Sequence, residues 1–267
     1  MDVLIRGDML FTGEELVRDA YLYMKNGKII EMGSGTPPEE YTFASLIIGG
    51  PGRFIGPALV APVDPIGYLV KSRNCTVPPI VSCEVRRRVN EEILSLPALL
   101  EAHTRGIGRV FLVVSDISVA TSLAEKLGAP MGAVIPGECR EVEQHPKLER
   151  VVPLSDLPVD PLVCPSRQLA RLDDPYTWSM DFAKAVGVNP PVIREGDRAS
   201  IVVYDMSQPP LMGLQVGSVE DASSVYSMCA KAESLLYGDN VLVEVGSHLL
   251  IVEKHLKEAR REMARIY

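Results

Sequence analysis

Two aspartates lie at positions where a parallel α/β sheet usually carries its chemistry. Asp64 follows the apolar run 59–63, and Asp116 comes just after the strand-like run 109–114. Parallel folds bind and transform their ligands at the carboxyl ends of strands. Two carboxylates there could act as the acid and base of a metal-independent reaction. An Asp–Pro turn at Asp64 and a turn or helix cap at Asp116 account for the same residues without catalysis.

Metal chemistry finds little support in the residue pattern. A catalytic zinc site needs three N, O or S ligands that converge and leave one position open. No HxH, HxxxH or HExxH pattern occurs among the four histidines, which are His103, His145, His248 and His255. The five cysteines are odd in number and form no CxxC pair, so neither a disulfide framework nor a zinc knuckle is indicated. We expect structural roles for the histidines and no dedicated metal site.

Composition narrows the class of protein further. The chain has 267 residues, 46% of them hydrophobic and 23% charged, which is typical of a globular protein. Its net charge of −8 argues against nucleic acid or an anionic membrane as the main partner. The only basic run, Arg86-Arg87-Arg88, is interpreted as a solvated or salt-bridged helix surface. Neither a signal peptide nor a membrane span is evident, so we expect a cytoplasmic protein.

The elements that must position these residues fall into three parts. Residues 1–60 have the pattern of short strands, with a hairpin expected at Asn26-Gly27. From about 60 to 190, strands alternate with helices, which predicts a parallel sheet covered by helices. We expect helices from Ser82 to about 94 and from 95 to 103, one capped by Ser118, and one from 174 to 187.

The last part of the chain returns to β character. A strand is expected over 199–205, and a hairpin is expected between 241–245 and 249–252. A charged amphipathic helix over about 253–266 ends the chain.

The segment 46–65 resembles a junction of the amidohydrolase superfamily, where a short β-domain leads into the first strand of a (β/α)8 barrel. Matching positions in register are Gly52, Arg53, Ile55, Pro57, Leu59 and Val60. The resemblance implies two metal-ligand histidines at positions 63 and 65. This chain has Val63 and Pro65 there, and neither side chain can bind a divalent ion.

Three further segments resemble the same family in the family's order. Residues 192–205 are similar to the run that follows the barrel, with Ser200 in place of the usual Asp. Residues 182–188 are similar to the helix end before it, and 241–251 to the hairpin after it. Residues 99–114 are similar to the first barrel helix and second strand, with Gly108 at the usual Thr position.

The resemblance implies an α+β fold of two domains. A composite β-sandwich with a terminal helix would come from residues 1–60 and 192–267, and a truncated α/β domain, a partial TIM barrel, from 61–191. A complete barrel needs about 200–250 residues, and only about 130 lie between the flanks. An incomplete parallel sheet exposes strand edges, so we expect a homo-oligomer or a partner subunit that covers them.

Three functions remain open at this point. The first is a non-catalytic amidohydrolase homologue that has lost its metal centre and either binds a small molecule or acts as a subunit of an assembly. The second is a hydrolase of non-peptide C–N bonds, such as cyclic amides or amidines, with an unrecognised site and bound zinc. The third is a metal-independent enzyme built on Asp64 and Asp116. Only the second requires a cofactor.

Overall fold

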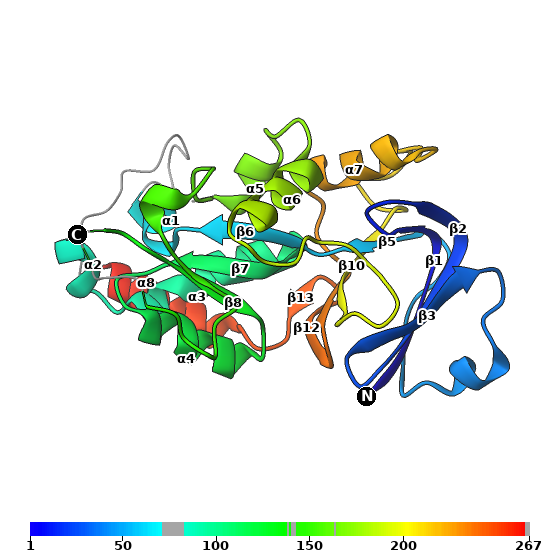
Figure 1. The fold of residues 1–267 in the computed structure, drawn as a ribbon, viewed down its shortest axis with the longest axis horizontal. Coiled ribbons are helices and arrows are strands. Elements are labelled where there is room, and N and C mark those ends of the chain that lie inside the picture. The colour runs from blue at the N-terminus through cyan, green and yellow to red at the C-terminus, as the bar shows by residue number, and fades with distance from the viewer. Residues whose placement is uncertain (71–82, 138, 140–142, 163, 265–267) are drawn as a thin grey trace.

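The structure is a computed structural model and describes residues 1–70, 83–137, 139, 143–162 and 164–264. Figure 1 shows a parallel sheet with helical cover at one end of the molecule and a larger β region at the other. The larger sheet has nine strands, which are β1 (Asp2–Phe11), β2 (Leu16–Lys25), β3 (Lys28–Ser34), β4 (Leu46–Gly49), β5 (Arg53–Pro57), β10 (Ser200–Asp205), β11 (Ser234–Tyr237), β12 (Asn240–Glu244) and β13 (Ser247–His248).

Both ends of the chain contribute to this larger sheet. The strand order is β13-β12-β11-β10-β5-β1-β2-β3, and β4 also pairs with β1. Strand β5 joins the two halves, because Ile55 pairs with Leu10 of β1 and with Val203 of β10. Buried side chains from both halves, such as Leu22 and Ile201, pack in one cluster. Strands from both ends of the chain therefore belong to one continuous sheet.

The second sheet is parallel, in the order β6-β7-β8-β9. Its strands are β6 (Leu59–Val63), β7 (Ile107–Val113), β8 (Met131–Ile135) and β9 (Val151–Pro153). An isolated parallel bridge from Leu162 to Val63 extends it on the far side of β6. The helices are α1 (Pro65–Val70), α2 (Cys83–Arg87), α3 (Glu91–Thr104), α4 (Ile117–Leu127), α5 (Pro165–Leu169), α6 (Pro175–Ala185), α7 (Val219–Ser227) and α8 (Glu253–Met263). The expectation of an α+β fold with a parallel sheet and helices is confirmed.

Helices cover both faces of the parallel sheet. On one face, Phe182 of α6 packs edge-on against Phe111 of β7, with ring centroids 5.3 Å apart. On the other face, Leu99 of α3 and Leu123 of α4 belong to the main hydrophobic core together with Leu112. Strands buried on both faces carry almost only apolar residues, and all seven residues of β7 are buried.

Several local predictions are confirmed because neighbouring residues decide them. Asn26 and Gly27 form the tight turn between β2 and β3 with positive φ angles of 51° and 74°. The Asp174 side chain caps α6 by accepting a 3.0 Å hydrogen bond from the Thr177 backbone N–H. Gly187 follows that helix with a φ of 72°, as a helix-ending glycine should.

The helices before β7 differ from the prediction. Helix α2 ends at Arg87, and α3 begins at Glu91 after Asn90, whose side chain accepts from the Ile93 backbone N–H. The expected restart at Ser95 is wrong, because its hydroxyl donates to the Glu91 carbonyl inside α3. Ser82, the expected cap, lies outside the described residues.

Two later boundaries also differ. Helix α4 is capped by Asp116 rather than Ser118, two residues earlier than expected. The expected strand over 249–252 is absent, and β12 pairs instead with the two-residue strand β13 and with β11. Two-residue strands carry too little pattern to be recognised from sequence.

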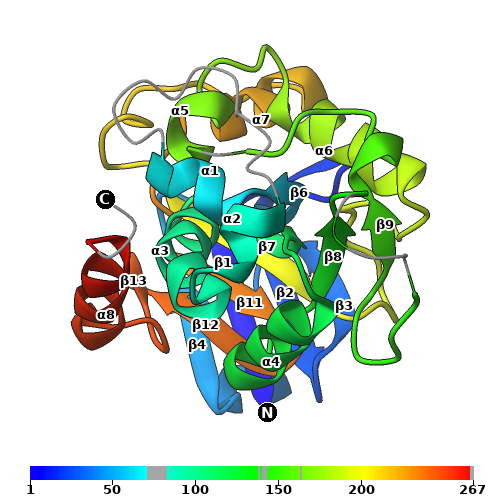
Figure 2. The ribbon, with the colours of Figure 1, turned by 90° about the vertical axis from the view of Figure 1, so that its left-hand side faces the viewer.

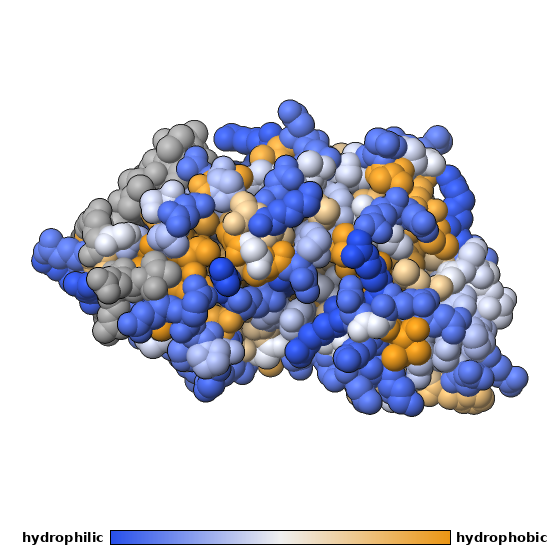
Figure 3. Space-filling model, viewed as in Figure 1, coloured by the Kyte–Doolittle hydropathy of each residue, from blue (hydrophilic) through white to orange (hydrophobic). Residues whose placement is uncertain are grey.

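The surface and the terminal helix complete the architecture. Figure 2 shows α8 beside α3, so the last helix packs on the α/β end of the molecule. On the face drawn in Figure 3, hydrophobic residues form separate small patches among hydrophilic ones. Within the ranges that the structure describes, no helix is both long and apolar enough to cross a membrane.

Candidate functional site

Asp64 lies directly after β6, at the carboxyl end of the parallel sheet. Its side chain is buried, with an exposed fraction of the residue of 4%. Carboxylate oxygen Oδ1 accepts hydrogen bonds of 3.1 Å from the backbone N–H groups of Ile66 and Gly67 at the start of α1. The backbone thus fixes the carboxylate at the strand end, as the sequence predicted for this position.

The side chain of Arg86 in α2 points toward the carboxyl end of β6 and binds Asp64 directly. Its Nη2 donates to both Asp64 oxygens, each at 2.8 Å, and these hydrogen bonds join two opposite charges. Its Nη1 donates to the Val113 carbonyl at 3.1 Å and to the Glu91 carboxylate at 3.3 Å. The basic run was interpreted as a solvated or salt-bridged surface. Arg86 is salt-bridged, but the surface location is wrong for it, because it is 1% exposed and this side of α2 packs against the strand ends.

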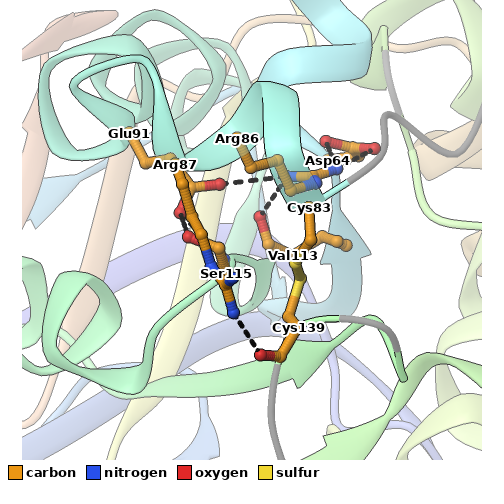
Figure 4. The surroundings of a disulfide bond; sticks show 8 residues. All are labelled: Asp64, Cys83, Arg86, Arg87, Glu91, Val113, Ser115 and Cys139. Atoms are coloured by element: carbon orange, nitrogen blue, oxygen red, sulfur yellow. Dashed lines mark hydrogen bonds and ion pairs between the residues drawn. A yellow bond between two sulfur atoms is a disulfide. The ribbon is translucent and has the colours of Figure 1, made fainter.

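Glu91 completes the arrangement from the first residue of α3. Its second oxygen accepts from the Ser115 backbone N–H at 2.8 Å and from the Ser115 hydroxyl at 2.6 Å. We call Asp64, Arg86, Glu91 and Ser115 the strand-end cluster (Figure 4). Two carboxylates face one guanidinium, so the formal charge of the cluster is −1, and its groups are compensated by hydrogen bonds as buried ions require.

A disulfide between Cys83 and Cys139 adjoins the cluster. Cys83 is the first described residue of α2, and Cys139 follows β8, 56 residues further along the chain. The expectation of no disulfide is therefore wrong, since the fold brings together cysteines whose spacing gave no sign of pairing. Disulfides persist in oxidising compartments and inside some heat-adapted organisms. The cytoplasmic location stays a prediction.

Asp116, the other predicted carboxylate, is half-buried at the first turn of α4. Its Oδ1 accepts a 2.9 Å hydrogen bond from the Ser118 backbone N–H, which makes it the N-cap of that helix. Helix capping was the alternative role that the sequence left open. A catalytic role for Asp64 or Asp116 stays a prediction.

The donor set does not fit the divalent metal that the family resemblance implies. Val63 is fully buried in β6 and Pro65 is the first residue of α1, and neither offers a ligand atom. Asp64, between them, already has both oxygens bound by Arg86. Among the described residues, no group of three or more His, Cys, Asp or Glu side chains is arranged to hold a metal ion.

A buried histidine pair lies away from the strand ends, where α3 meets β13. His103 Nδ1 and His248 Nε2 are 2.8 Å apart. His248 Nδ1 accepts from the backbone N–H groups of Leu250 and Ile251, so the His248 proton is on Nε2 and is donated to His103. Burial, and then the neighbouring His248, lower the pKa of His103 to about 3, and burial lowers the pKa of His248 to about 4.

This pair fits the structural roles expected of the histidines. The two residues are 145 positions apart, so their contact had no signal in the sequence. Both rings are neutral at pH 7, because their lowered pKa values lie far below it.

Known structures share this fold at low sequence identity. One is an adenosine deaminase from Xanthomonas campestris with bound zinc, with a TM-score of 0.73, 12% identity, and coverage of 99% of this chain and 98% of that chain. Another is a triazine hydrolase variant, with a TM-score of 0.69, 13% identity, and coverage of 98% and 99%. A third is an amidohydrolase from an environmental sample of the Sargasso Sea, with a TM-score of 0.63, 13% identity, and coverage of 100% and 99%.

These structures are members of the amidohydrolase superfamily. This chain has their fold. No protein-family model matches the sequence, and no curated protein matches it either. At identities of 12–13% the likeness concerns the fold alone, and function has to be argued from the site.

Proposed function

We propose that this protein is a non-catalytic homologue of the amidohydrolases, in which an internal salt-bridge cluster has replaced the metal centre. The proposal includes a barrel shortened to its first strands, since four parallel strands and one bridge form the described sheet. Such a protein would bind a small molecule or serve as a subunit of an assembly.

One observation carries this proposal. The guanidinium of Arg86 lies at the carboxyl ends of β6 and β7, where the family's first two ligands would hold a metal cation. It brings positive charge to Asp64 and Glu91 through three hydrogen bonds of 2.8 to 3.3 Å. Unlike a metal, an arginine with all these partners has no open position that could activate water. In this proposal the protein keeps the amidohydrolase fold but lacks the metal ion that would activate water.

A second candidate function is favoured by the structural neighbours. Two of them are described as a triazine hydrolase and an adenosine deaminase, the latter with bound zinc. A hydrolase of non-peptide C–N bonds would need zinc ligands other than positions 63 and 65. In this second candidate, the residues that bind the zinc ion would differ from the metal ligands of the amidohydrolase superfamily.

Metal content per chain decides between the two candidates. We would purify the protein without a metal-binding tag or chelator, dialyse it against zinc, and measure bound transition metals by elemental mass spectrometry. The proposal predicts a value near zero before and after dialysis. About one metal per chain would contradict it, and hydrolysis of triazines, adenosine and cyclic amides would then be assayed.

Coverage of the sheet edges by another subunit also stays a proposal. At β9, the side-chain amide of Gln144 already occupies the edge, because it donates to the Val151 carbonyl and accepts from the Val151 N–H. The outer edge of β4 is the better place for a second chain, since Ile47 there is 55% exposed. Native mass spectrometry would test this, and a monomer at micromolar concentration would contradict it.

A further inference from the structure

Helix α2 combines three contacts within five residues. Cys83 at its start forms the disulfide with Cys139, and Arg86 one turn later fills the strand-end cluster. Arg87 donates a 2.6 Å hydrogen bond to the Cys139 carbonyl, so it reinforces the same attachment. Figure 4 shows the disulfide and the Arg86 side chain leaving the same helix toward neighbouring strand ends.

We propose that the strand-end cluster is a redox-controlled binding site for a planar nitrogen cation, and that Arg86 is its resident occupant in the oxidised protein. The disulfide holds α2 against the sheet and so keeps the Arg86 guanidinium between Asp64 and Glu91. When the disulfide is reduced, α2 is released and the site accepts an external guanidinium or amidinium ion.

The acceptors of the cluster define the chemical class of this ligand. Asp64 presents two oxygens side by side, each 2.8 Å from Nη2, while Glu91 and the Val113 carbonyl face Nη1. Acceptors spread in this way match the fixed fork of N–H groups in a guanidinium or amidinium. A spherical ammonium without N–H groups cannot satisfy them.

The disulfide is suited to hold this occupant in place. The described part of α2 comprises five residues, and its side chains attach it to the strand ends. Helix α2 therefore depends on its attachments, of which the covalent one is the strongest. Reduction by a dithiol gives the Cys83 and Cys139 thiols and oxidises the reductant to its own disulfide, with two electrons and two protons transferred. The Cys83 and Cys139 residues are 4% and 5% exposed, so the reductant acts during local opening.

Amide hydrogen exchange provides the first test. The backbone N–H groups of Ile66, Gly67 and Ser115 donate to the carboxylates of the cluster and report on its integrity. We would compare the oxidised protein with the variant C83S/C139S, and use C229S, which removes a free cysteine among the described residues, as the matched control. Exchange at these amides should be at least 10-fold faster in C83S/C139S and unchanged in C229S, while strands β1 and β2 stay protected.

The same comparison is then made on the wild-type protein after treatment with dithiothreitol. Unchanged exchange at the three amides in both forms would overturn the proposal. Equal acceleration throughout the molecule would also overturn it, because the disulfide would then support the whole fold rather than α2.

Cation binding provides the second test. In R86A the resident guanidinium is gone, and millimolar methylguanidinium should raise the thermal midpoint in a saturable manner by several degrees, as selective binding to the folded state requires. Tetramethylammonium, which has no N–H groups, is the control ligand, and R88A is the control variant. No shift, or an equal shift with tetramethylammonium, would overturn the assignment of the ligand class.

The inference rests on the proposed function in one respect, because it assumes that the strand ends hold no catalytic metal. The proposed function and the redox control of the strand-end cluster can be contradicted independently of each other. One metal per chain would contradict the proposed function, whereas a metal-free protein with unaltered exchange would contradict only the redox control.

Discussion

The guanidinium of Arg86 and the carboxylate of Asp64 form an ion pair in which Nη2 donates two 2.8 Å hydrogen bonds, between side chains that are 0% and 5% exposed. Asp64 follows a strand, and Arg86 belongs to a short helix 22 residues later. Their contact explains how a carboxylate can stay buried at the end of a strand.

Arg86→Ala tests how much the fold depends on this pair. The substitution leaves the buried carboxylates of Asp64 and Glu91 without their cation, which typically costs about 3–5 kcal/mol. The free energy of unfolding, from urea titration, should fall by that amount. Arg88→Ala, which removes an arginine 72% exposed on the same helix, should leave it nearly unchanged. Equal effects of the two substitutions would contradict the structure of the cluster.

Ser115→Ala removes one donor to the cluster without removing a charge. The hydroxyl gives a 2.6 Å hydrogen bond to Glu91, and bonds to charged groups contribute about 1.5–3 kcal/mol. We expect a loss of stability in that range, measured in the same titration. Ser118→Ala at the exposed start of α4 is the control, and a Ser115 variant as stable as that control would contradict this role.

Acidification should destabilise the protein through the His103–His248 pair. The folded pKa values of about 3 and about 4 lie below the ordinary value of 6.5, so the unfolded chain binds protons that the folded protein does not. This contribution is complete above about pH 6.5 and is lost as the pH falls toward 4. We expect a loss of about 4 kcal/mol between pH 7.5 and pH 5, of which each histidine contributes about half.

Substitution of one histidine of the pair tests this pH dependence, and substitution of a histidine outside the pair is the control. His248→Gln should flatten the curve of unfolding free energy against pH, whereas His145→Gln, outside the pair, should not. Two parallel curves would show that the pair is not the source of the acid sensitivity.

Gly108→Thr tests why the chain departs from the family at this position. A Cβ at Gly108 would lie 2.7 Å from the Cβ of Ala58 and 3.5 Å from Leu235, so a larger side chain does not fit between β7 and the composite sheet. We expect a loss of about 1–3 kcal/mol from overpacking. Gly137→Ala, with no atom within 4 Å of the added Cβ, is the control. Partial rescue by Ala58→Gly would confirm that these two positions are in contact.

The sequence was informative where one segment determines its own structure. The Asn26-Gly27 turn, the Asp174 cap and the buried strand β7 depend on adjacent residues, and all three were predicted. The resemblance also placed Asp64 correctly at a strand end. These features are encoded within a few positions, so no knowledge of tertiary contacts was needed.

The partners of Asp64 could not be predicted for the opposite reason. Arg86, the Cys83–Cys139 disulfide and the His103–His248 pair join residues that are 22, 56 and 145 positions apart. Three consecutive arginines look alike in a sequence, and only the packing of α2 separates the buried Arg86 from its exposed neighbour Arg88. The one available sign was an unpaired Asp64 in an apolar setting, which required a cation from elsewhere in the chain.

The position of β5 in the larger sheet has a consequence for synthesis of the protein on the ribosome. Pro57 at the end of β5 pairs with Ile201 of β10, which is translated 144 residues later. At about 5–20 residues per second, that edge of the nascent sheet stays unpaired for roughly seven to thirty seconds. During that interval the newborn chain presents an open strand edge to its surroundings. Chaperone binding to the growing chain should therefore be strongest before β10 has left the exit tunnel.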